Sequence, residues 1–317
     1  MLRMSKCIAA FGMLISPITY ADNQQMQWPN NVATHTVNKA EASQNGLNKA
    51  EQIGTSYLNN QLQQTASKWL SRTDINYTLQ ENHKPVGSVE TIQPLYLRNS
   101  HTVFWQGRLA YSGSETTGNL GVGYRYLTDN KQLMWGINTF YDQNLTRSHK
   151  RVGLGAEAFT PYLTFRANYY DAISGNRQVG GYTERALNGY DGSIETPVPY
   201  IPWTRFKAEG YHWNGVNTSD VNGEIGSFRV FPTRQIEVDL GVAHDNSQGR
   251  QAFLQLNYYF EHPAFIQYSA TTSGFTNGFA PLNLEDLRLQ KVFRHNDIVV
   301  EKNSAAGTGG ITIARGT

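Results

Sequence analysis

The sequence has almost no cysteine and no long apolar segment. Cys7 is the only cysteine among 317 residues, and it lies within the first 21. Without that segment the chain can form no disulfide and offers no thiol chemistry. After residue 21, no apolar run approaches the roughly 18 residues that a membrane-spanning helix needs, which excludes a helical membrane protein.

Charge is also scarce. Charged residues make up 16% of the chain, against roughly 25% in a typical soluble domain. The chain has 27 basic and 25 acidic residues, and the first 21 positions contain two basic residues and no acid, so the remainder is neutral. Nothing in this balance resembles a nucleic-acid footprint. Few charges with 18 Tyr and 29 Gly are typical of an outer-membrane β-barrel.

Residues 1–21 have the three parts of a secretory signal peptide. Arg3 and Lys6 make a basic start, residues 7–18 form a short apolar core, and Ala21 supplies the small residue at the end. The pattern predicts cleavage between Ala21 and Asp22. A membrane anchor is the alternative, but the apolar core is too short to span a bilayer and polar sequence follows it.

Residues 22–72 are predicted to be a periplasmic polar segment that ends in a short amphipathic helix, with the membrane surface and the barrel mouth as alternative places for the helix. Residues 22–50 are rich in Asn, Gln and Ala. Apolar residues then recur at three- and four-residue spacing, which makes one helical stripe. The stripe consists of Ile53, Tyr57, Leu58, Leu62, Ala66, Trp69 and Leu70.

After Ser71 the hydrophobic period changes to two. Leu120 and Val122, for example, alternate with Asn119 and Gly121. Such alternation predicts strands with an apolar face toward lipid and a polar or glycine face toward a wet interior, although a soluble sandwich also alternates. We predict twelve strands, at 73–80, 91–97, 102–111, 118–127, 132–142, 150–159, 162–172, 189–198, 204–213, 222–231, 234–244 and 250–260. The predicted fold is therefore all-β, a 12-stranded antiparallel transmembrane barrel.

The predicted connections support a barrel over a sandwich. Those after the even-numbered strands are short, and those after the odd-numbered strands are mostly longer, with residues 173–188 the longest. Outer-membrane barrels have short periplasmic turns and longer outer loops. The last strand places Leu254, Leu256, Tyr258 and Phe260 on one face and ends in an aromatic residue. We interpret these four residues as the signal that the barrel-assembly machinery reads.

Several stretches resemble the translocator barrel of the intimin/invasin family, the inverse autotransporters. They lie in order over roughly residues 60–302 and include GNLGVGYRY (118–126), MWGINTFYD (134–142), RFKAEGY (205–211), LQLNY (254–258) and VFRHNDIVVE (292–301). The resemblance implies a 12-stranded barrel at residues 73–260. It also implies a linker that returns through the pore and carries folded domains outside, where they bind host cells or other bacteria.

Residues 261–317 are expected to be that pore-threading linker. The stretch from Asp297 through Ile298, Val299 and Val300 to Glu301 is predicted to be extended, whereas residues 282–293 look helical. Roughly nine extended residues cross a bilayer core of about 30 Å. An immunoglobulin-like domain needs about 100 residues, so we expect the passenger to be absent or truncated.

The sequence predicts no catalytic residue, no metal site and no cofactor. Gly153, Gly155 and Ala158 partly match a dinucleotide-binding fingerprint, but the sequence continues as a strand instead of a helix. The expected location is the bacterial outer membrane, crossed by many strands. The expected partners are outer-membrane lipid, the barrel-assembly machinery and a receptor on a host or bacterial surface, but no nucleic acid. The expected role is to export a C-terminal segment for adhesion or invasion, with a passive pore or an outer-membrane enzyme as alternatives.

Overall fold

The computed structural model of the protein describes residues 69–260, 278–304 and 309–312. The predicted signal peptide with Ala21 and Asp22, the polar segment and most of the predicted amphipathic helix lie outside these residues. No helix in the described part of the chain is long and apolar enough to cross a membrane.

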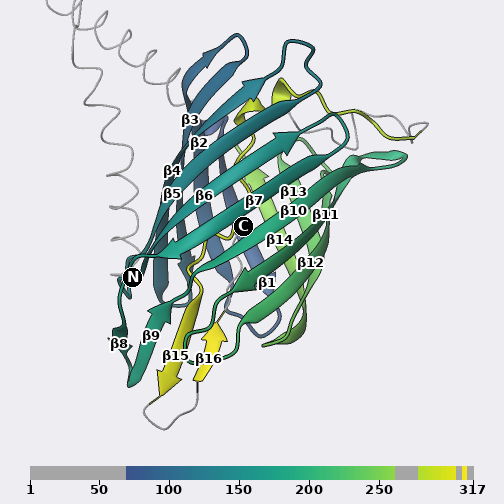
Figure 1. The fold of residues 1–317 in the computed structure, drawn as a ribbon. Coiled ribbons are helices and arrows are strands. Elements are labelled where there is room, and N and C mark those ends of the chain that lie inside the picture. Colours follow the sequence, from purple (N-terminus) through teal and green to yellow (C-terminus); the bar gives the residue numbers. More distant parts are fainter. Residues whose placement is uncertain (1–68, 261–277, 305–308, 313–317) are drawn as a thin grey trace, which may run out of the picture. The chain divides into compact units, whose positions relative to one another are not determined.

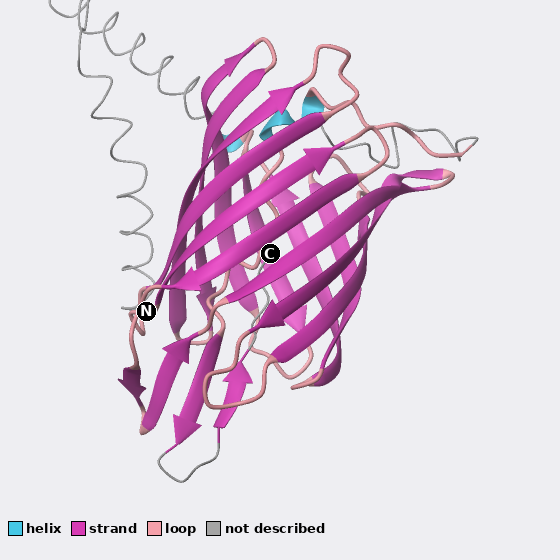
Figure 2. Cartoon of the chain, viewed as in Figure 1, coloured by secondary structure: helices cyan, strands magenta, loops and turns pink. Residues whose placement is uncertain are grey.

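Twelve antiparallel strands close into a barrel (Figures 1 and 2). They are β1 (Thr73–Gln80), β2 (Val86–Arg98), β3 (His101–Ser112), β4 (Glu115–Leu127), β5 (Met134–Asn144), β6 (Lys150–Phe159), β7 (Thr164–Ala172), β10 (Gly189–Val198), β11 (Ile201–Trp213), β12 (Val221–Val230), β13 (Ile236–Asp245) and β14 (Gly249–Tyr259). Each strand pairs with its neighbours in sequence, and β1 pairs with β14 to close the seam. The predicted fold class and strand number are confirmed.

Four further strands form a small sheet at one end of the barrel. These are β8 (Arg177–Val179), β9 (Tyr182–Ala186), β15 (Val300–Ser304) and β16 (Gly309–Thr312), in the order β16-β15-β9-β8. In Figure 1 the yellow strands β15 and β16 lie beside β8 and β9. We call this end of the barrel the small-sheet end. The connection at residues 173–188, predicted as the longest, therefore contains two short strands, β8 and β9.

The opposite end carries η1 (Asp286–Leu289), a single 3-10 turn, and we call it the η1 end. A longer helix at residues 282–293 was predicted from its apolar spacing, and this prediction is wrong. Gln290, directly after the turn, already has an extended backbone with ψ near 139°. The apolar residues of this stretch pack into different clusters along the pore, which an extended chain can reach and one helical face cannot.

The connections alternate in length less regularly than the sequence predicted. The β3–β4 turn at the small-sheet end has only residues 113–114, whereas the β4–β5 connection at the η1 end spans 128–133. Gly113 adopts a φ of +63°, in the left-handed region that a two-residue hairpin turn requires. The strands on either side are longer than predicted because of this tight turn. The two longest connections, 173–188 and 214–220, still lie at the small-sheet end.

The alternation of side chains matches the prediction. On β4, Leu120 and Val122 are 51% and 47% exposed on the outside, while Asn119 is buried inside. Exposed aromatic residues lie outside near both ends of the barrel, as in the interfacial belts of membrane proteins. Tyr96, Trp135, Tyr162 and Tyr200 lie toward the η1 end, and Tyr77, Tyr111, Tyr141 and Tyr190 lie toward the small-sheet end.

Candidate functional site: the linker-filled pore

The inside of the barrel is lined by charged and amide side chains. Strand alternation places them there, because every second residue of each strand points inward. Six arginines occupy such positions and are almost fully buried: Arg108, Arg125, Arg151, Arg166, Arg205 and Arg229. Their partners include residues 282–299, which run through the barrel from the η1 end to the small-sheet end (Figure 1). We call residues 278–304 the linker.

Apolar contacts hold the linker at the η1 end. Leu282, Leu284 and Leu287 pack with three buried barrel residues, Leu127, Met134 and Phe159. The Leu282 N–H also donates to the carbonyl oxygen of Pro161 at 2.7 Å. Burying such side chains contributes roughly 1.5–3 kcal/mol each relative to full exposure. The linker is therefore anchored at this end before it enters the polar part of the pore.

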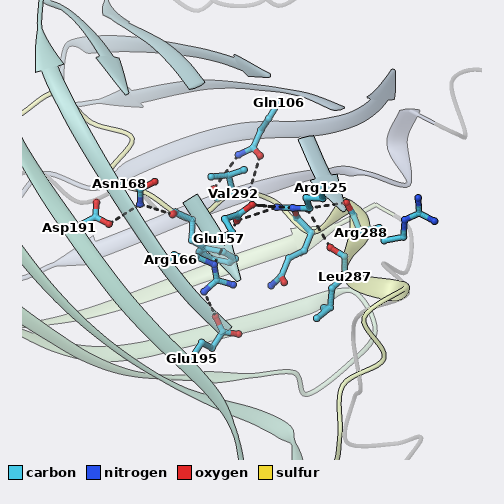
Figure 3. A network of polar contacts seen from close by, with 12 residues as sticks. Gln106, Arg125, Glu157, Arg166, Asn168, Asp191, Glu195, Leu287, Arg288 and Val292 are labelled. Atoms are coloured by element: carbon cyan, nitrogen blue, oxygen red, sulfur yellow. Dashed lines mark hydrogen bonds and ion pairs between the residues drawn. The ribbon is translucent and has the colours of Figure 1, made fainter. Parts of the chain in front are cut away.

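Arg125 holds carbonyl oxygens at the end of the 3-10 turn (Figure 3). Its guanidinium donates to the carbonyls of Arg288 and Gln290 at 3.0 and 2.6 Å. The same group pairs with the Glu157 carboxylate at 2.9 Å, and both side chains are buried. These carbonyls have no helical partner at the end of a short turn, so the arginine supplies the missing donor.

Side-chain amides hold the next residues of the linker. Gln106 accepts from the Val292 N–H at 2.9 Å and donates to the Val292 carbonyl at 3.3 Å. Asn168 donates to the Phe293 carbonyl at 3.2 Å (Figure 3). A buried backbone group without a partner is costly. The barrel wall thus supplies hydrogen bonds that an isolated extended chain lacks.

Asp142 lies at the centre of the strongest charged contacts. The linker residue Arg294 donates to both of its oxygens, at 2.8 and 2.6 Å. Arg151 of the wall pairs with it at 2.9 Å and also donates to the His295 carbonyl. Gly153 makes room for this arrangement, because a Cβ at that position would lie 2.8 Å from the Arg294 guanidinium. The glycine pair of the dismissed dinucleotide motif therefore serves packing inside the barrel.

A second charged cluster surrounds Glu195. Arg166, Arg205 and Arg229 pair with its carboxylate at 3.0, 3.3 and 3.0 Å, and all four side chains are buried. The ring of Phe293 contacts two of these arginines, with its centroid 4.7 Å from the Arg166 guanidinium and 4.4 Å from that of Arg229. Both distances are those of a cation–π contact.

The predicted linker residues lie at the small-sheet end. Asp297 pairs with Arg108 at 3.4 Å, and the Val299 carbonyl accepts from the Leu187 N–H at 3.0 Å. Val299 is buried in a cluster with Trp213 and Ile311. Ile298 is half-buried between these contacts. Val300 and Glu301 begin β15, which pairs with β9 over five residues.

Two carboxylates secure the small sheet. Glu301 accepts from the backbone N–H groups of Val216 and Asn217 at 2.7 and 2.9 Å. Burial would raise the pKa of Glu301, but these donors prevail and hold the pKa of this carboxyl below its ordinary value. Glu184 on β9 contacts Arg147, and it contacts His149 at 3.2 Å and Lys302 of β15 at 3.5 Å.

His149 is a buried imidazole in the β5–β6 connection. Its side chain is fully buried. Burial lowers the pKa of His149 below 6.5, although the hydrogen bond to Glu184 opposes the shift. The imidazole is therefore neutral at pH 7, and the Glu184 contact is a hydrogen bond to the neutral ring.

The four residues of the predicted assembly signal lie on the outer face at the barrel seam. Leu256 and Tyr258 are 41% and 44% exposed on β14, Leu254 is half-buried beside them, and Phe260 follows the strand. Leu256 and Tyr258 lie opposite Tyr77 and Ile75 of β1. Among the described residues, no group of three or more His, Cys, Asp or Glu is arranged to hold a metal ion.

Sequence reasoning did not single out the wall residues that hold the linker. Arg125, Asp142, Arg151 and Gln106 lie within predicted strands at positions of inward alternation. That inward pattern is the signal that could have identified them as pore-lining. Their pairing with particular linker residues, however, depends on the register of the linker, which no sequence pattern indicates.

The chain belongs to the inverse autotransporter beta-domain family, which matches residues 24–296. A closed barrel with a polar interior and a linker inside it fits this membership. The protein is accordingly an outer-membrane protein that crosses the membrane with many strands.

Curated relatives include an invasin, an intimin and an inverse autotransporter adhesin. Invasin of Yersinia enterocolitica is 26% identical over 323 residues, which cover 95% of this chain and 37% of the relative. Intimin of Escherichia coli O127:H6 is 25% identical, covering 68% of this chain and 24% of the relative. The inverse autotransporter adhesin YeeJ of Escherichia coli K12 is 28% identical, covering 49% and 7%. The chain thus spans well under half the length of each of these three relatives.

A solved structure from work on in-meso crystallization of membrane proteins has a similar fold. It superposes with a TM-score of 0.60 and 22% identity, covering 73% of this chain and all of that one. This likeness supports the fold alone.

Proposed function

We propose that this chain is the outer-membrane translocator of an intimin/invasin-like adhesin, which anchors and exports a C-terminal segment for adhesion or invasion. The observation that carries the proposal is the linker, which runs from the η1 end to the small sheet and contacts the wall along its length. Because the strand count is even, the chain enters β1 and leaves β14 on the same side of the membrane. The η1 end then faces the periplasm, and the small sheet lies outside the cell.

The remaining segments have matching roles in this proposal. Residues 1–21 direct export and are removed between Ala21 and Asp22, and residues 22–72 stay in the periplasm. Residues 73–260 form the barrel, whose final strand is read by the assembly machinery through Leu254, Leu256, Tyr258 and Phe260. Residues 261–317 thread the pore, and whatever the C-terminal segment presents outside meets a host-cell or bacterial receptor.

The proposal includes no catalytic step. The buried carboxylates and arginines inside the barrel are engaged with one another and with the linker, as in the Asp142 and Glu195 clusters. A role in holding an extended chain accounts for these contacts. A permanently open pore fits less well, because three apolar clusters and many hydrogen bonds fill the path.

The test is surface exposure of the C-terminus. An epitope is placed after Thr317, outer-membrane fractionation is confirmed, and intact cells are treated with antibody and with protease. We expect the tag to be reached from outside. A tag that is cut only after the outer membrane is permeabilised would contradict export. Conductance in planar bilayers separates the pore alternative: the full chain should conduct little, and a chain ending at Phe260 should conduct more.

A further inference from the structure

The contacts between barrel and linker are of two kinds. In the first kind, wall side chains donate to backbone carbonyl oxygens. Arg125 does so at residues 288 and 290, Asn168 at 293, Arg151 at 295 and Asn119 at 296. Every amino acid has such a carbonyl, so these hydrogen bonds would form with almost any extended sequence. They hold a chain in the pore but do not select which residues stop there.

In the second kind, side chains of the linker contact side chains of the wall, and these contacts are concentrated at residues 291–295. Lys291 pairs with Asp74 on β1, and with Glu90 on β2 at 3.6 Å. Phe293 makes cation–π contacts with two arginines, and Arg294 makes its two-point contact with Asp142. His295 contacts the Glu209 carboxylate at 2.7 Å. We call Lys291, Phe293, Arg294 and His295 the register segment.

We propose that the register segment determines where the linker stops in the pore, and therefore which residues emerge to form β15. This inference rests on the proposed threading of the linker and adds the residues that set its position. A displacement of two residues would bring Phe293 to the carboxylates of Asp74 and Glu90, or bring Lys291 between two arginines. Either arrangement leaves buried charges without a partner, which is strongly destabilising.

The alternative is that pairing of β15 with β9 determines where the linker stops in the pore. β15 makes five residue pairs with β9, and Glu301 accepts from Val216 and Asn217. Apart from Glu301, these contacts are hydrogen bonds between backbone groups, which do not depend on which residues are paired. Exchanging one backbone hydrogen bond for another changes stability far less than leaving a buried charge without its partner. A shifted β15 also keeps a ladder, because a two-residue slip preserves which face each side chain occupies.

The experiment uncouples the two determinants with two alanines inserted between Asp297 and Ile298. Cysteine pairs report the register in the full chain with Cys7 replaced by serine. Ala186 lies opposite Val300 in the native pairing, so Ala186→Cys with Val300→Cys reports the native register. Ala186→Cys with Ile298→Cys reports a two-residue shift. Disulfide-linked peptides are quantified by mass spectrometry after mild oxidation, and heat-modifiable gel migration confirms a folded barrel.

Without the insertion, we expect the native pair to crosslink and the shifted pair to remain reduced. With the insertion, we expect the ratio of the two crosslinks to reverse by more than about tenfold, because the register segment keeps its place. The proposal is overturned if the native pair still dominates after the insertion, since β9 pairing would then set the position. If neither pair crosslinks in the chain without the insertion, the threading itself is refuted, and with it the proposed function.

A matched variant removes the register segment's charges. Lys291→Gln and Arg294→Gln are combined with the same insertion. We expect the native crosslink to return, because the linker then lacks its ion pairs with Asp74, Glu90 and Asp142 and competes less with β9 pairing. Persistence of the shifted crosslink in this variant would also overturn the proposal. If the double variant fails to fold, the insertion alone still decides the question.

Discussion

At the scale of single residues, buried charged side chains inside the barrel determine which linker residue lies beside which wall residue. Asp142 is the clearest case, since it neutralises Arg151 from the wall and Arg294 from the linker together. Alternation along β5 predicts from sequence that Asp142 points inward. Its pairing could not be predicted, because Arg294 is 152 positions away and reaches it only when the linker has a particular register.

Replacing Asp142 with alanine should destabilise the barrel strongly. Two buried guanidinium groups would lose their carboxylate, and breaking a buried pair typically costs about 3–5 kcal/mol. Urea unfolding in detergent, monitored by tryptophan fluorescence, measures the free energy of unfolding. Asp129→Ala in an exposed turn is the control and should change it by no more than about 0.5 kcal/mol. Equal effects of the two substitutions would contradict the assigned role.

The small sheet should loosen as the pH falls, and His149 should account for the first part of the change. Its pKa in the folded protein is below the ordinary value of 6.5. The unfolded state therefore binds the proton more tightly, so the contribution of His149 is full above pH 6.5 and is lost as the pH falls through the lowered value. Glu301, with its lowered pKa, contributes above pH 4.5 and is lost further down. Hydrogen exchange of β9 amides between pH 8 and 5 measures the first change.

His149→Gln is the matched variant for this measurement. Glutamine keeps a hydrogen-bond donor for Glu184 but does not titrate. Protection of the β9 amides should then be nearly constant between pH 8 and 5. A wild-type profile that is already flat, after correction for the intrinsic exchange rate, would contradict the prediction.

At the scale of elements, the barrel strands could be predicted from the sequence, whereas the small sheet could not. The twelve barrel strands follow from period-two alternation, because lipid and a polar interior impose opposite demands on alternate residues. β8 and β9 are short, and β9 gains its partner β15 from more than a hundred residues away, so local patterns could not predict them. The overestimated helix at 282–293 fails for a related reason: the barrel wall, instead of a helix, satisfies its backbone.

Removing β8 and β9 should free the emerging linker while leaving the barrel intact. Residues 174–186 are replaced with a Gly-Ser spacer, so that β15 loses β9 as a pairing partner and keeps only β16. We expect protease cleavage near Asn303 on intact cells to rise by about tenfold or more, because its backbone is then paired on one side only. The same spacer inserted in the 128–133 connection at the η1 end is the control. Unchanged cleavage would show that β9 does not hold β15.

The final strand should be required for assembly more than for stability. Tyr258→Ser with Phe260→Ser removes two exposed aromatic side chains at the seam. We expect the amount in the outer membrane to fall several-fold, while refolding from urea into detergent changes little. Phe165→Ser with Tyr169→Ser removes aromatics of similar exposure from β7 and should leave assembly nearly unchanged. Equal losses for both pairs would indicate a general effect of lipid-facing aromatics.

At the scale of the whole molecule, barrel and linker form one connected core. Three apolar clusters combine wall and linker residues along the path from the η1 end to the small sheet. The sequence predicted a barrel with a tail long enough to cross it, because the number of residues fixes how far an extended chain can span. It could not predict that tail side chains complete the interior charge pairs, because that depends on packing between distant segments.

The central claim, that the linker crosses the membrane through the barrel with the small sheet outside, is tested most directly by thiol labelling. Single cysteines are placed at Asn283, at the η1 end, and at Asn303, in β15, in a chain with Cys7 replaced by serine. Intact cells are treated with a membrane-impermeant maleimide. The account predicts labelling at position 303 in intact cells, and at position 283 only after permeabilisation. Protection of position 303 in intact cells, or labelling of both positions from outside, would contradict it.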